Sequence, residues 1–367
     1  MGRMEETDEM TIAYYIASPT WGGGEQYVFD LAAAMKESGK ATPVFLFPAN
    51  SDKNMIARFR TIGVCPASPF ARKCFRFSIL ASLRLARIME RYKVDILHVN
   101  SRFPYFQAAM AKRMCRRPVR LVATRHLVRK AGDNSLWRWA YRQIDTLICV
   151  SRLVRSAYIT SELEGCFQRI EVVHNSVRIP KESCSQTPDY STARILYHGR
   201  ICKEKGVHIL LRALECIQDL PWQLDIAGAV APEYKAYWEH ALETCSVSNR
   251  VHWLGFRDDI RQILPDYSIG VLPSIVPEAF SLTVLEDMAY GLATVSSNNG
   301  AVPEFVEDGS NGLLVNPGDE VALSVALRRL IGDCNERKRL GEQAQEDYRK
   351  NHNYDQFIAK MNQIYGL

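Results

Sequence analysis

The most informative charged segment of the sequence is HGRICKEKG at residues 198–206. It follows a short run of β-branched and aromatic residues and precedes an apolar pattern at 207–214 that is typical of a helix. The guanidinium of Arg200 can donate two parallel hydrogen bonds to a phosphate, and the ammonium of Lys205 adds a compact positive charge. Because both follow a predicted strand, we interpret Arg200 and Lys205 as ligands of a diphosphate and Lys203 as a surface residue.

A second segment, PEAFSLTVLEDMAYG at residues 277–291, has the signals of a helix with a defined start and end. Ser281 is a suitable N-cap, and Gly291 is placed to end the helix. The unpaired amides of Leu282 and Thr283 in the first turn would then point toward an anion. This helix start is therefore a second candidate for binding a phosphate.

Two glutamates of the same segment are candidates for binding hydroxyl groups. Glu278 precedes the predicted helix and Glu286 lies inside it, so both can face one ligand from different depths. Carboxylates accept hydrogen bonds from paired hydroxyls such as those of a ribose or a hexose. Glutamates on helices more often point to solvent, but the apolar residues around Glu286 make an unpaired carboxylate there costly.

Three consecutive glycines, Gly22, Gly23 and Gly24, follow the first predicted strand and precede a helical pattern at 26–36. Glycines let the backbone turn tightly and approach a ligand, and the start of a helix offers unpaired amides. The spacing differs from the G-x-G-x-x-G pattern of dinucleotide-binding proteins. A ligand-binding loop and a purely geometric strand-to-helix turn both remain open here.

These segments need strands and helices that bring them together. Short strand-like runs alternate with helical patterns along the chain, which indicates βαβ units and parallel sheets in an α/β fold. The predicted strands are residues 10–17, 42–47, 94–99, 121–124, 146–150, 193–197, 223–227, 250–254, 268–272 and 293–296.

A polar stretch rich in Ser, Thr and Pro interrupts this alternation. We predict a first domain over residues 1–180, a linker over 181–192 and a second domain over 193–352. A final helix at about 353–367 is expected to pack back on the first domain. Each domain should be a doubly wound, Rossmann-like sheet, with ligands bound beyond the carboxyl ends of the strands in a cleft between the two facing domains.

The composition is that of an ordinary globular protein, with 47% hydrophobic and 24% charged residues among 367. No stretch reaches the roughly 18 apolar residues that a membrane span requires, and the N-terminus lacks a secretory-signal pattern. The ten cysteines include no C-x-x-C pair and no zinc-ligand spacing. We therefore expect a cytoplasmic protein with reduced thiols and no metal site.

The net charge of +5 is unevenly distributed. Residues 1–180 hold 28 Lys+Arg and 15 Asp+Glu, a charge of +13, whereas residues 181–367 hold 18 and 26, a charge of −8. The segment 72–93 combines basic and apolar residues at helical spacing. It predicts either a helix that lies on an anionic membrane or a core-packed helix with a solvated basic face. The acidic second half argues against nucleic-acid binding.

Taken in order, these motifs resemble those of the family-four retaining glycosyltransferases, which have the two-domain GT-B fold. The segment 198–206 looks like the family's phosphate-binding segment, and Glu278 to Glu286 is similar to its E-x(7)-E element. Other stretches that resemble family motifs are GGGE at 22–25, TRH at 124–126, VS at 150–151, VHN at 173–175, NGAVPE at 299–304 and DGSNGLLV at 308–315.

The resemblance implies a role for each candidate residue. Arg200 and Lys205 would bind the diphosphate of a nucleotide-sugar donor. Glu286 would hold the ribose hydroxyls and Glu278 would touch the transferred sugar. His126 would sit by the sugar, where an imidazole can donate a hydrogen bond or orient the acceptor. Residues implied to approach the donor through their backbone are Gly22, Gly23, Gly24, Phe280, Ser281, Leu282 and Thr283.

The reaction that the resemblance implies is the retaining, metal-independent transfer of a hexose-type sugar to a glycan or lipid-linked acceptor, in the synthesis of cell-surface polysaccharide or lipopolysaccharide. The departing phosphate would take the acceptor proton, and fixed cations and amides would stabilise its charge. No resident cofactor is expected, and the protein would be cytoplasmic or peripheral on the inner face of the plasma membrane. Two alternatives are a sugar-nucleotide epimerase on the same fold and a non-catalytic nucleotide-sugar-binding protein.

Overall fold

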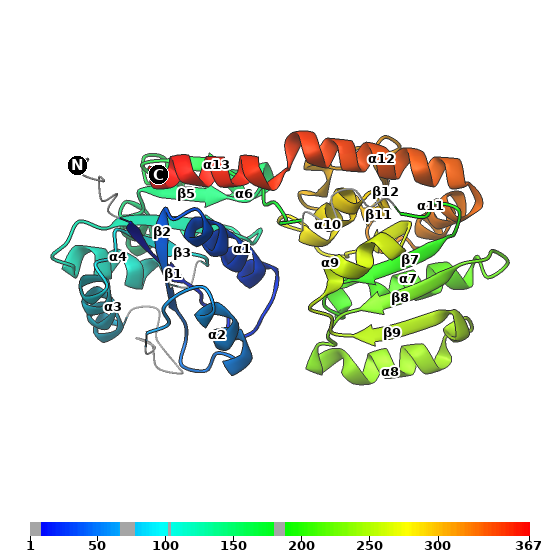
Figure 1. Ribbon diagram of the computed structural model, residues 1–367, viewed down its shortest axis with the longest axis horizontal. Coiled ribbons are helices and arrows are strands. Elements are labelled where there is room, and N and C mark those ends of the chain that lie inside the picture. Colours follow the sequence, from blue (N-terminus) through cyan, green and yellow to red (C-terminus); the bar gives the residue numbers. More distant parts are fainter. Residues whose placement is uncertain (1–8, 67–77, 102–103, 180–187) are drawn as a thin grey trace, which may run out of the picture. The chain divides into compact units, whose positions relative to one another are not determined.

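The computed structural model describes residues 9–66, 78–101, 104–179 and 188–367. The chain divides into two compact α/β units (Figure 1). Unit 1 spans Met1–His174 and Asp355–Leu367, and unit 2 spans Asn175–Tyr354. No helix in the described ranges is both long and apolar enough to cross a bilayer.

Unit 1 is built on a six-stranded parallel sheet in the order β2-β1-β3-β4-β5-β6. All four residues of β3 and of β5 are buried, because helices cover both faces of the sheet. The strands are β1 (Met10–Tyr15), β2 (Ala41–Leu46), β3 (Ile96–Val99), β4 (Arg120–Arg125), β5 (Thr146–Cys149) and β6 (Ile170–Val172). The helices are α1 (Gly23–Glu37), α2 (Lys53–Arg60), α3 (Ile79–Arg91), α4 (Tyr105–Met114), α5 (Ser135–Tyr141), α6 (Arg152–Ser156) and α13 (Tyr354–Tyr365).

Unit 2 is built on a second six-stranded parallel sheet, in the order β12-β11-β10-β7-β8-β9. The strands are β7 (Arg194–His198), β8 (Gln223–Ala227), β9 (Val251–Gly255), β10 (Ile269–Leu272), β11 (Ala293–Ser297) and β12 (Leu313–Val315). The helices are α7 (Val207–Glu215), α8 (Lys235–Thr244), α9 (Ile260–Ile263), α10 (Leu282–Tyr290), α11 (Glu320–Gly332) and α12 (Cys334–Asn351).

The strand order of unit 2 creates a crevice at its centre. Numbered along the chain from β7, the strands lie in the order 3-2-1-4-5-6, which is the Rossmann arrangement. Successive strands are added on one side of β7 as far as β9 and on its other side from β10 onward. Ligands of such sheets bind at this reversal point, beyond the carboxyl ends of the two strands, and we call this part of unit 2 the crevice. The predicted α/β architecture with doubly wound sheets is confirmed.

The sequence misses the last strand of each sheet. Strands β6 and β12 have three residues each, too few to show the alternation that identifies a strand. The sequence also predicts the first domain to run to residue 180. In the structure residues 175–179 belong to unit 2, where the Ser176 hydroxyl donates to the His352 carbonyl at 2.6 Å and the Tyr348 hydroxyl donates to the Val177 carbonyl at 2.7 Å. Residues 181–187, most of the predicted linker, lie outside the described residues.

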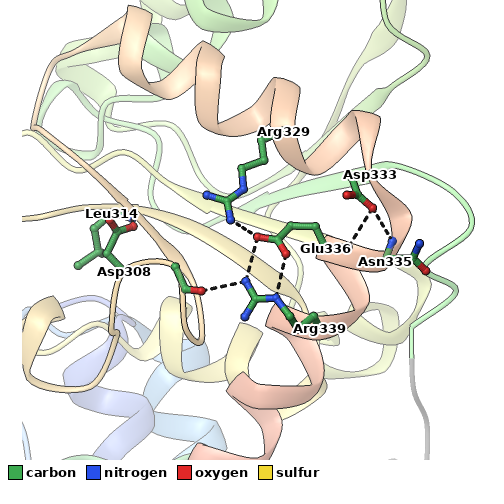
Figure 2. A network of polar contacts seen from close by, with 8 residues as sticks. Asp308, Leu314, Arg329, Asp333, Asn335, Glu336 and Arg339 are labelled. Carbon is green, nitrogen blue, oxygen red and sulfur yellow. Dashed lines mark hydrogen bonds and ion pairs between the residues drawn. The ribbon is translucent and has the colours of Figure 1, made fainter.

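A polar network fixes α12 against α11 and the loop that precedes β12 (Figure 2). Both oxygens of the Glu336 carboxylate accept hydrogen bonds from Arg339 at 2.9 Å, and Arg329 pairs with the same carboxylate. These contacts lower the pKa of Glu336. Arg339 also donates to the Gly309 carbonyl at 2.9 Å, and Asp333 caps the first turn of α12. Because α12 packs along α10, the network also steadies the helix that carries Glu286.

Candidate active site

The two charged segments identified in the sequence meet at the crevice of unit 2. One follows β7 and the other follows β10, so both lie at the carboxyl ends of the two central strands. The Ile275 amide donates to the Glu204 carbonyl at 2.8 Å and joins the two loops. Gly206 has a φ of +70°, and a Cβ there would lie 2.0 Å from the Pro273 carbonyl oxygen. Only glycine allows the loops to approach this closely.

Lys205 and Glu278 form an ion pair at this point. The Lys205 Nζ lies 2.6 Å from Glu278 Oε1, and the Ser274 hydroxyl donates to the same oxygen. Arg200 is exposed and forms no ion pair with a described residue, while its carbonyl accepts a hydrogen bond from the Tyr197 hydroxyl at 2.9 Å. Lys203 is also exposed. Arg200 is thus free to contact an anion, whereas Lys205 would share its ammonium between the anion and Glu278.

The loop that carries Glu278 is held by a motif whose mechanical role the sequence did not reveal. Gly300 has a φ of +66°, and a Cβ there would lie 2.2 Å from the Glu278 carbonyl oxygen and 2.3 Å from its amide nitrogen. The Ala301 amide donates to the Glu278 carbonyl at 2.8 Å. The Asn299 side chain donates to the Ile275 carbonyl at 3.1 Å. The NGA stretch at 299–301 therefore holds the loop after β10 at Ile275 and Glu278.

Helix α10 begins and ends where the sequence predicts. Ser281 is its N-cap and accepts a hydrogen bond from the Val284 amide at 3.3 Å, and Gly291 ends it with a φ of +77°. The Thr283 hydroxyl donates to the His198 carbonyl at 3.1 Å and connects the helix start to the end of β7. The ring of Phe280 is buried and stacks on Phe305 with centroids 4.7 Å apart, so only its backbone can face a ligand.

Glu286 is buried but not unpaired, as the apolar pattern around it requires. Its Oε1 accepts a hydrogen bond from Arg261 Nε at 3.0 Å. Arg261 also donates to the Arg178 carbonyl at 3.1 Å. Sequence reasoning missed Arg261 because α9 has only four residues and shows no amphipathic period. Only the folded chain shows that this arginine lies beside Glu286, the residue predicted to bind the ribose.

In unit 1 the glycine segment differs from the predicted loop. Helix α1 begins at Gly23 with Gly22 as N-cap, so Gly23 and Gly24 form part of its first turn. The predicted helical pattern starts at residue 26 because glycine weakens the propensity signal of a first turn. A Cβ at Gly24 would meet nothing within 4 Å, so open space lies beside it. Glu25, which the sequence did not single out, lies in the same turn, and burial raises the pKa of its carboxyl.

His126 follows the end of β4 and is partly buried. Its ring packs edge-on against Tyr27 with centroids 4.8 Å apart. Burial, assisted by the charge of Arg125, lowers the pKa of His126 to about 4, so its imidazole is neutral near pH 7. Its Nε2 is buried and has no hydrogen-bond partner among the described residues. A neutral ring with one unused nitrogen can exchange a hydrogen bond with a hydroxyl of a ligand.

The crevice of unit 2 combines groups that suit a nucleotide-diphosphate sugar. An exposed arginine, a lysine and the amides at the start of α10 can bind phosphates, and two carboxylates can accept hydroxyls. Across the described ranges, no three His, Cys, Asp or Glu side chains gather in a way that could hold a metal ion.

Two Rossmann-like units, each built on a parallel sheet, define a protein of the GT-B class. Residues 182–347 match the family described as Glycosyl transferases group 1, and residues 21–179 match Glycosyltransferase Family 4. Together the two matches span nearly the whole chain in the expected order. The chain belongs to the family-four glycosyltransferases.

Similar proteins include several named glycosyltransferases. The chain is 24% identical over 305 residues to N-acetyl-alpha-D-glucosaminyl L-malate synthase of Bacillus anthracis, with 79% of each chain covered. It is 24% identical over 337 residues to the lipopolysaccharide core biosynthesis glycosyltransferase LpsE of Rhizobium meliloti, covering 89% of this chain and 90% of LpsE. The structure of Anabaena HepE in complex with UDP-glucose has a TM-score of 0.80 and 20% identity, covering 98% of this chain and 100% of HepE. This structural likeness establishes the shared fold.

Proposed function

We propose that this chain is a retaining, metal-independent glycosyltransferase that moves a hexose-type sugar from a nucleotide-diphosphate donor to a glycan or lipid-linked acceptor. The observation that carries the proposal is the convergence of Arg200, Lys205, Glu278 and the start of α10 at the crevice between β7 and β10. Two features of relatives support it: HepE was solved with UDP-glucose, and LpsE is named for lipopolysaccharide core biosynthesis. We accordingly propose a role in the synthesis of cell-surface polysaccharide or lipopolysaccharide.

The proposed donor site divides the nucleotide sugar among these groups. Arg200, Lys205 and the amides of Leu282 and Thr283 bind the diphosphate, because cations and helix starts favour anions. Glu286 accepts the ribose hydroxyls, and Glu278 accepts a hydroxyl of the sugar. These cations and amides supply the positive potential that a metal ion supplies in other transferases.

In the proposed reaction, the bond between the anomeric carbon and the phosphate oxygen breaks while the acceptor hydroxyl oxygen bonds to the same face of that carbon. The acceptor proton passes to the departing phosphate oxygen, so configuration is retained and no enzyme nucleophile is required. Arg200 and Lys205 stabilise the charge that grows on the phosphate. We propose that His126, neutral near pH 7, donates or accepts a hydrogen bond at a hydroxyl of the sugar or acceptor.

The proposal is tested with UDP-, GDP- and ADP-sugars labelled in the sugar. A thermal-shift screen first identifies the donor, because a ligand that binds only the folded state raises Tm. Incubation of that donor with a lipid or glycan extract should then give a labelled product with the donor's anomeric configuration, and EDTA should not reduce the rate. A label that stays on the nucleotide as an epimer indicates an epimerase, and binding without turnover indicates a non-catalytic protein. Activity lost with EDTA and restored by magnesium or manganese would contradict metal independence.

We further propose that the protein associates with the cytoplasmic face of an anionic membrane through α3. Residues 72–77 of the basic segment lie outside the described residues. The described part serves both interpretations of the sequence: Ala81, Leu85 and Met89 pack into the core, while Ile79 and Leu80 remain 58% and 57% exposed. The other exposed side chains of α3 are Leu83, Arg84, Arg87 and Arg91. Apolar groups flanked by arginines suit an anionic bilayer surface.

A further inference from the structure

A buried charged network lies behind Glu286 in unit 2. His198, the last residue of β7, places its Nε2 2.8 Å from Asp287 Oδ1 and its Nδ1 3.7 Å from Glu286 Oε2. On the other side of Glu286, Arg261 Nε lies 3.0 Å from Oε1. The side chain of Asp287 is fully buried, and that of His198 is 6% exposed. Two carboxylates thus alternate with an imidazole and a guanidinium across β7, α9 and α10.

The backbone makes room for this network. Gly270 lies on β10, and a Cβ there would come 2.1 Å from Asp287 Oδ2 and 2.4 Å from its Cγ. A side chain at Gly270 would therefore push the Asp287 carboxylate out of its place. The remaining oxygen, Oδ2, has no hydrogen-bond partner among the described residues. Hydrogen bonding thus fixes the carboxylate only through His198, at a cost that an apolar side chain would avoid.

The network is electrostatically balanced when His198 carries a proton. Burial opposes a charge on the ring, but the attraction and hydrogen bond of Asp287, together with Glu286, outweigh it and raise the pKa of His198. An imidazolium and a guanidinium then offset two carboxylates, which is the condition under which buried charges are tolerated. Each oxygen of Glu286 faces one basic side chain: Oε1 accepts a hydrogen bond from Arg261 Nε at 3.0 Å, and Oε2 lies 3.7 Å from His198 Nδ1, close enough for electrostatic attraction.

We propose that His198 and Asp287, together with Arg261, act as positioning residues that set the orientation in which Glu286 accepts the two ribose hydroxyls of the donor. The inference rests on the proposed role of Glu286 in donor binding. A carboxylate accepts two neighbouring hydroxyls well only at one rotation about its terminal bond, and a carboxylate held on one side alone would rotate. On this proposal, the preference for a ribonucleotide over its 2′-deoxy form depends on these three side chains as well as on Glu286.

The experiment measures this preference as a ratio of two dissociation constants. The ligand is whichever of UDP, GDP and ADP binds the full-length protein most tightly, compared with its 2′-deoxy form. Hydrogen bonds from hydroxyls to a charged group are worth roughly ten- to a hundredfold in affinity, and the wild-type ratio should lie in that range. His198→Gln and Asp287→Asn should each reduce the ratio at least about fivefold by weakening the ribonucleotide form, with little change for the deoxy form.

Three further variants make the result decisive. Glu286→Gln should bring the ratio close to one, and adding His198→Gln to it should reduce the ratio no further, because both changes act through one contact. His252→Gln is the matched control: His252 Nδ1 lies 2.9 Å from Asp225 Oδ1, a second His–Asp pair of the same sheet that does not touch Glu286. This control should keep the wild-type ratio.

The outcomes separate the inference from the function on which it rests. Wild-type ratios in folded His198→Gln and Asp287→Asn, with the ratio lost in Glu286→Gln, would overturn the positioning role and leave the donor site standing. A wild-type ratio in Glu286→Gln would show that Glu286 does not bind the ribose, and the proposed donor site would fall. Should His198→Gln not fold, Asp287→Asn alone tests the proposal, because it preserves the shape of the side chain.

Discussion

Arg200 and Lys205 carry the same charge, but the fold places them in different surroundings. Lys205 is fixed by Glu278, 73 positions away in sequence, whereas Arg200 is exposed at the mouth of the crevice. From their position after a predicted strand, the sequence predicts both as phosphate ligands. It could not pair Lys205 with Glu278, because a contact over that separation depends on the strand order that brings β7 beside β10.

This difference predicts distinct effects of removing each side chain. Arg200→Ala should weaken donor binding by about 1.5–3 kcal/mol, roughly ten- to a hundredfold, and should lower kcat as well, because the charge on the phosphate grows in the transition state. Lys205→Ala should do the same and also lower Tm, since it leaves the partly buried Glu278 carboxylate without its cation.

Lys203→Ala serves as the control for both changes, because Lys203 is exposed in the same short segment. It should leave donor KM, kcat and Tm unchanged. Steady-state kinetics at subsaturating donor, with Tm measured on each variant, check these expectations. Wild-type transfer rates in folded Arg200→Ala and Lys205→Ala would show that the diphosphate binds elsewhere.

At the scale of elements, the sequence predicts features that depend on neighbouring residues, such as the ends of a helix. It does not predict contacts between residues far apart in the chain. Helix α10 could be bounded from Ser281 and Gly291 alone, because a cap acts within its own turn. The sequence also predicted that the last helix packs on the first domain, but it could not predict the contacts that attach α13 to the sheet of unit 1. The Tyr365 hydroxyl lies 2.6 Å from His98 Nδ1, across 267 positions of sequence, and Arg120 donates to the carbonyls of Tyr365 and Ile364 at 2.8 and 2.6 Å.

The end of the unit 1 sheet beside α13 holds two histidines in their neutral form. His98 is fully buried, and its Nε2 lies 2.7 Å from the Thr124 hydroxyl at the end of β4. Burial, together with the nearby His126, lowers the pKa of His98 to about 3. Both hydroxyl partners can donate or accept, which satisfies a neutral imidazole. Protonation of either histidine would therefore work against the fold.

We predict that stability falls as the pH is lowered from about 6.5 to 4. The unfolded chain binds protons on His98 and His126 near pH 6.5, whereas the folded chain does not bind them until pH 4 or below. Each group should cost at most about 1.4 kcal/mol of unfolding free energy per pH unit in that interval. The measurement is Tm against pH for wild type and for His126→Gln. Tm of the variant should fall less steeply with pH, because it has one such histidine fewer.

His240→Gln is the control for this comparison, because His240 is exposed on α8. It should reproduce the wild-type dependence of Tm on pH. If His126→Gln loses stability with falling pH as steeply as the wild type does, then His126 takes up its proton in the fold as readily as in the unfolded chain.

At the scale of the whole chain, the order of motifs was more informative than any one of them. Glycine turns, paired glutamates and basic segments each have ordinary structural explanations, but their sequence from residue 22 to residue 315 matched one family. The α/β class followed from the alternation of strand-like and helical patterns, and the resemblance to that family implied that the two charged segments bind the same donor. Arg261, His198 and Asp287 were out of reach, because their effect depends on distances among three elements that only the folded chain sets.

The split of charge along the chain, +13 over residues 1–180 and −8 over residues 181–367, also belongs to this scale. An anionic surface would attract residues 1–180 and repel residues 181–367. In the described part of unit 1, the arginines of α3 stand beside exposed apolar side chains. Apolar side chains would add binding that salt does not screen, which gives a way to test membrane docking against a basic surface of no particular function.

We predict reversible binding to vesicles that contain anionic lipid, weaker at high salt and much weaker with neutral vesicles. Arg84→Gln/Arg87→Gln should reduce binding roughly thirtyfold, since each basic residue near an anionic surface adds about 1 kcal/mol. Leu80→Ser/Leu83→Ser should remove the part of the binding that persists in high salt. The matched control, Lys235→Gln/Lys338→Gln, removes two exposed lysines from unit 2 and should change nothing. Co-sedimentation with vesicles measures the binding of the wild type and of the three variants. Equal binding to neutral and anionic vesicles, or unchanged binding in the α3 variants, would contradict the membrane role. Neither outcome would affect the proposed glycosyltransferase site.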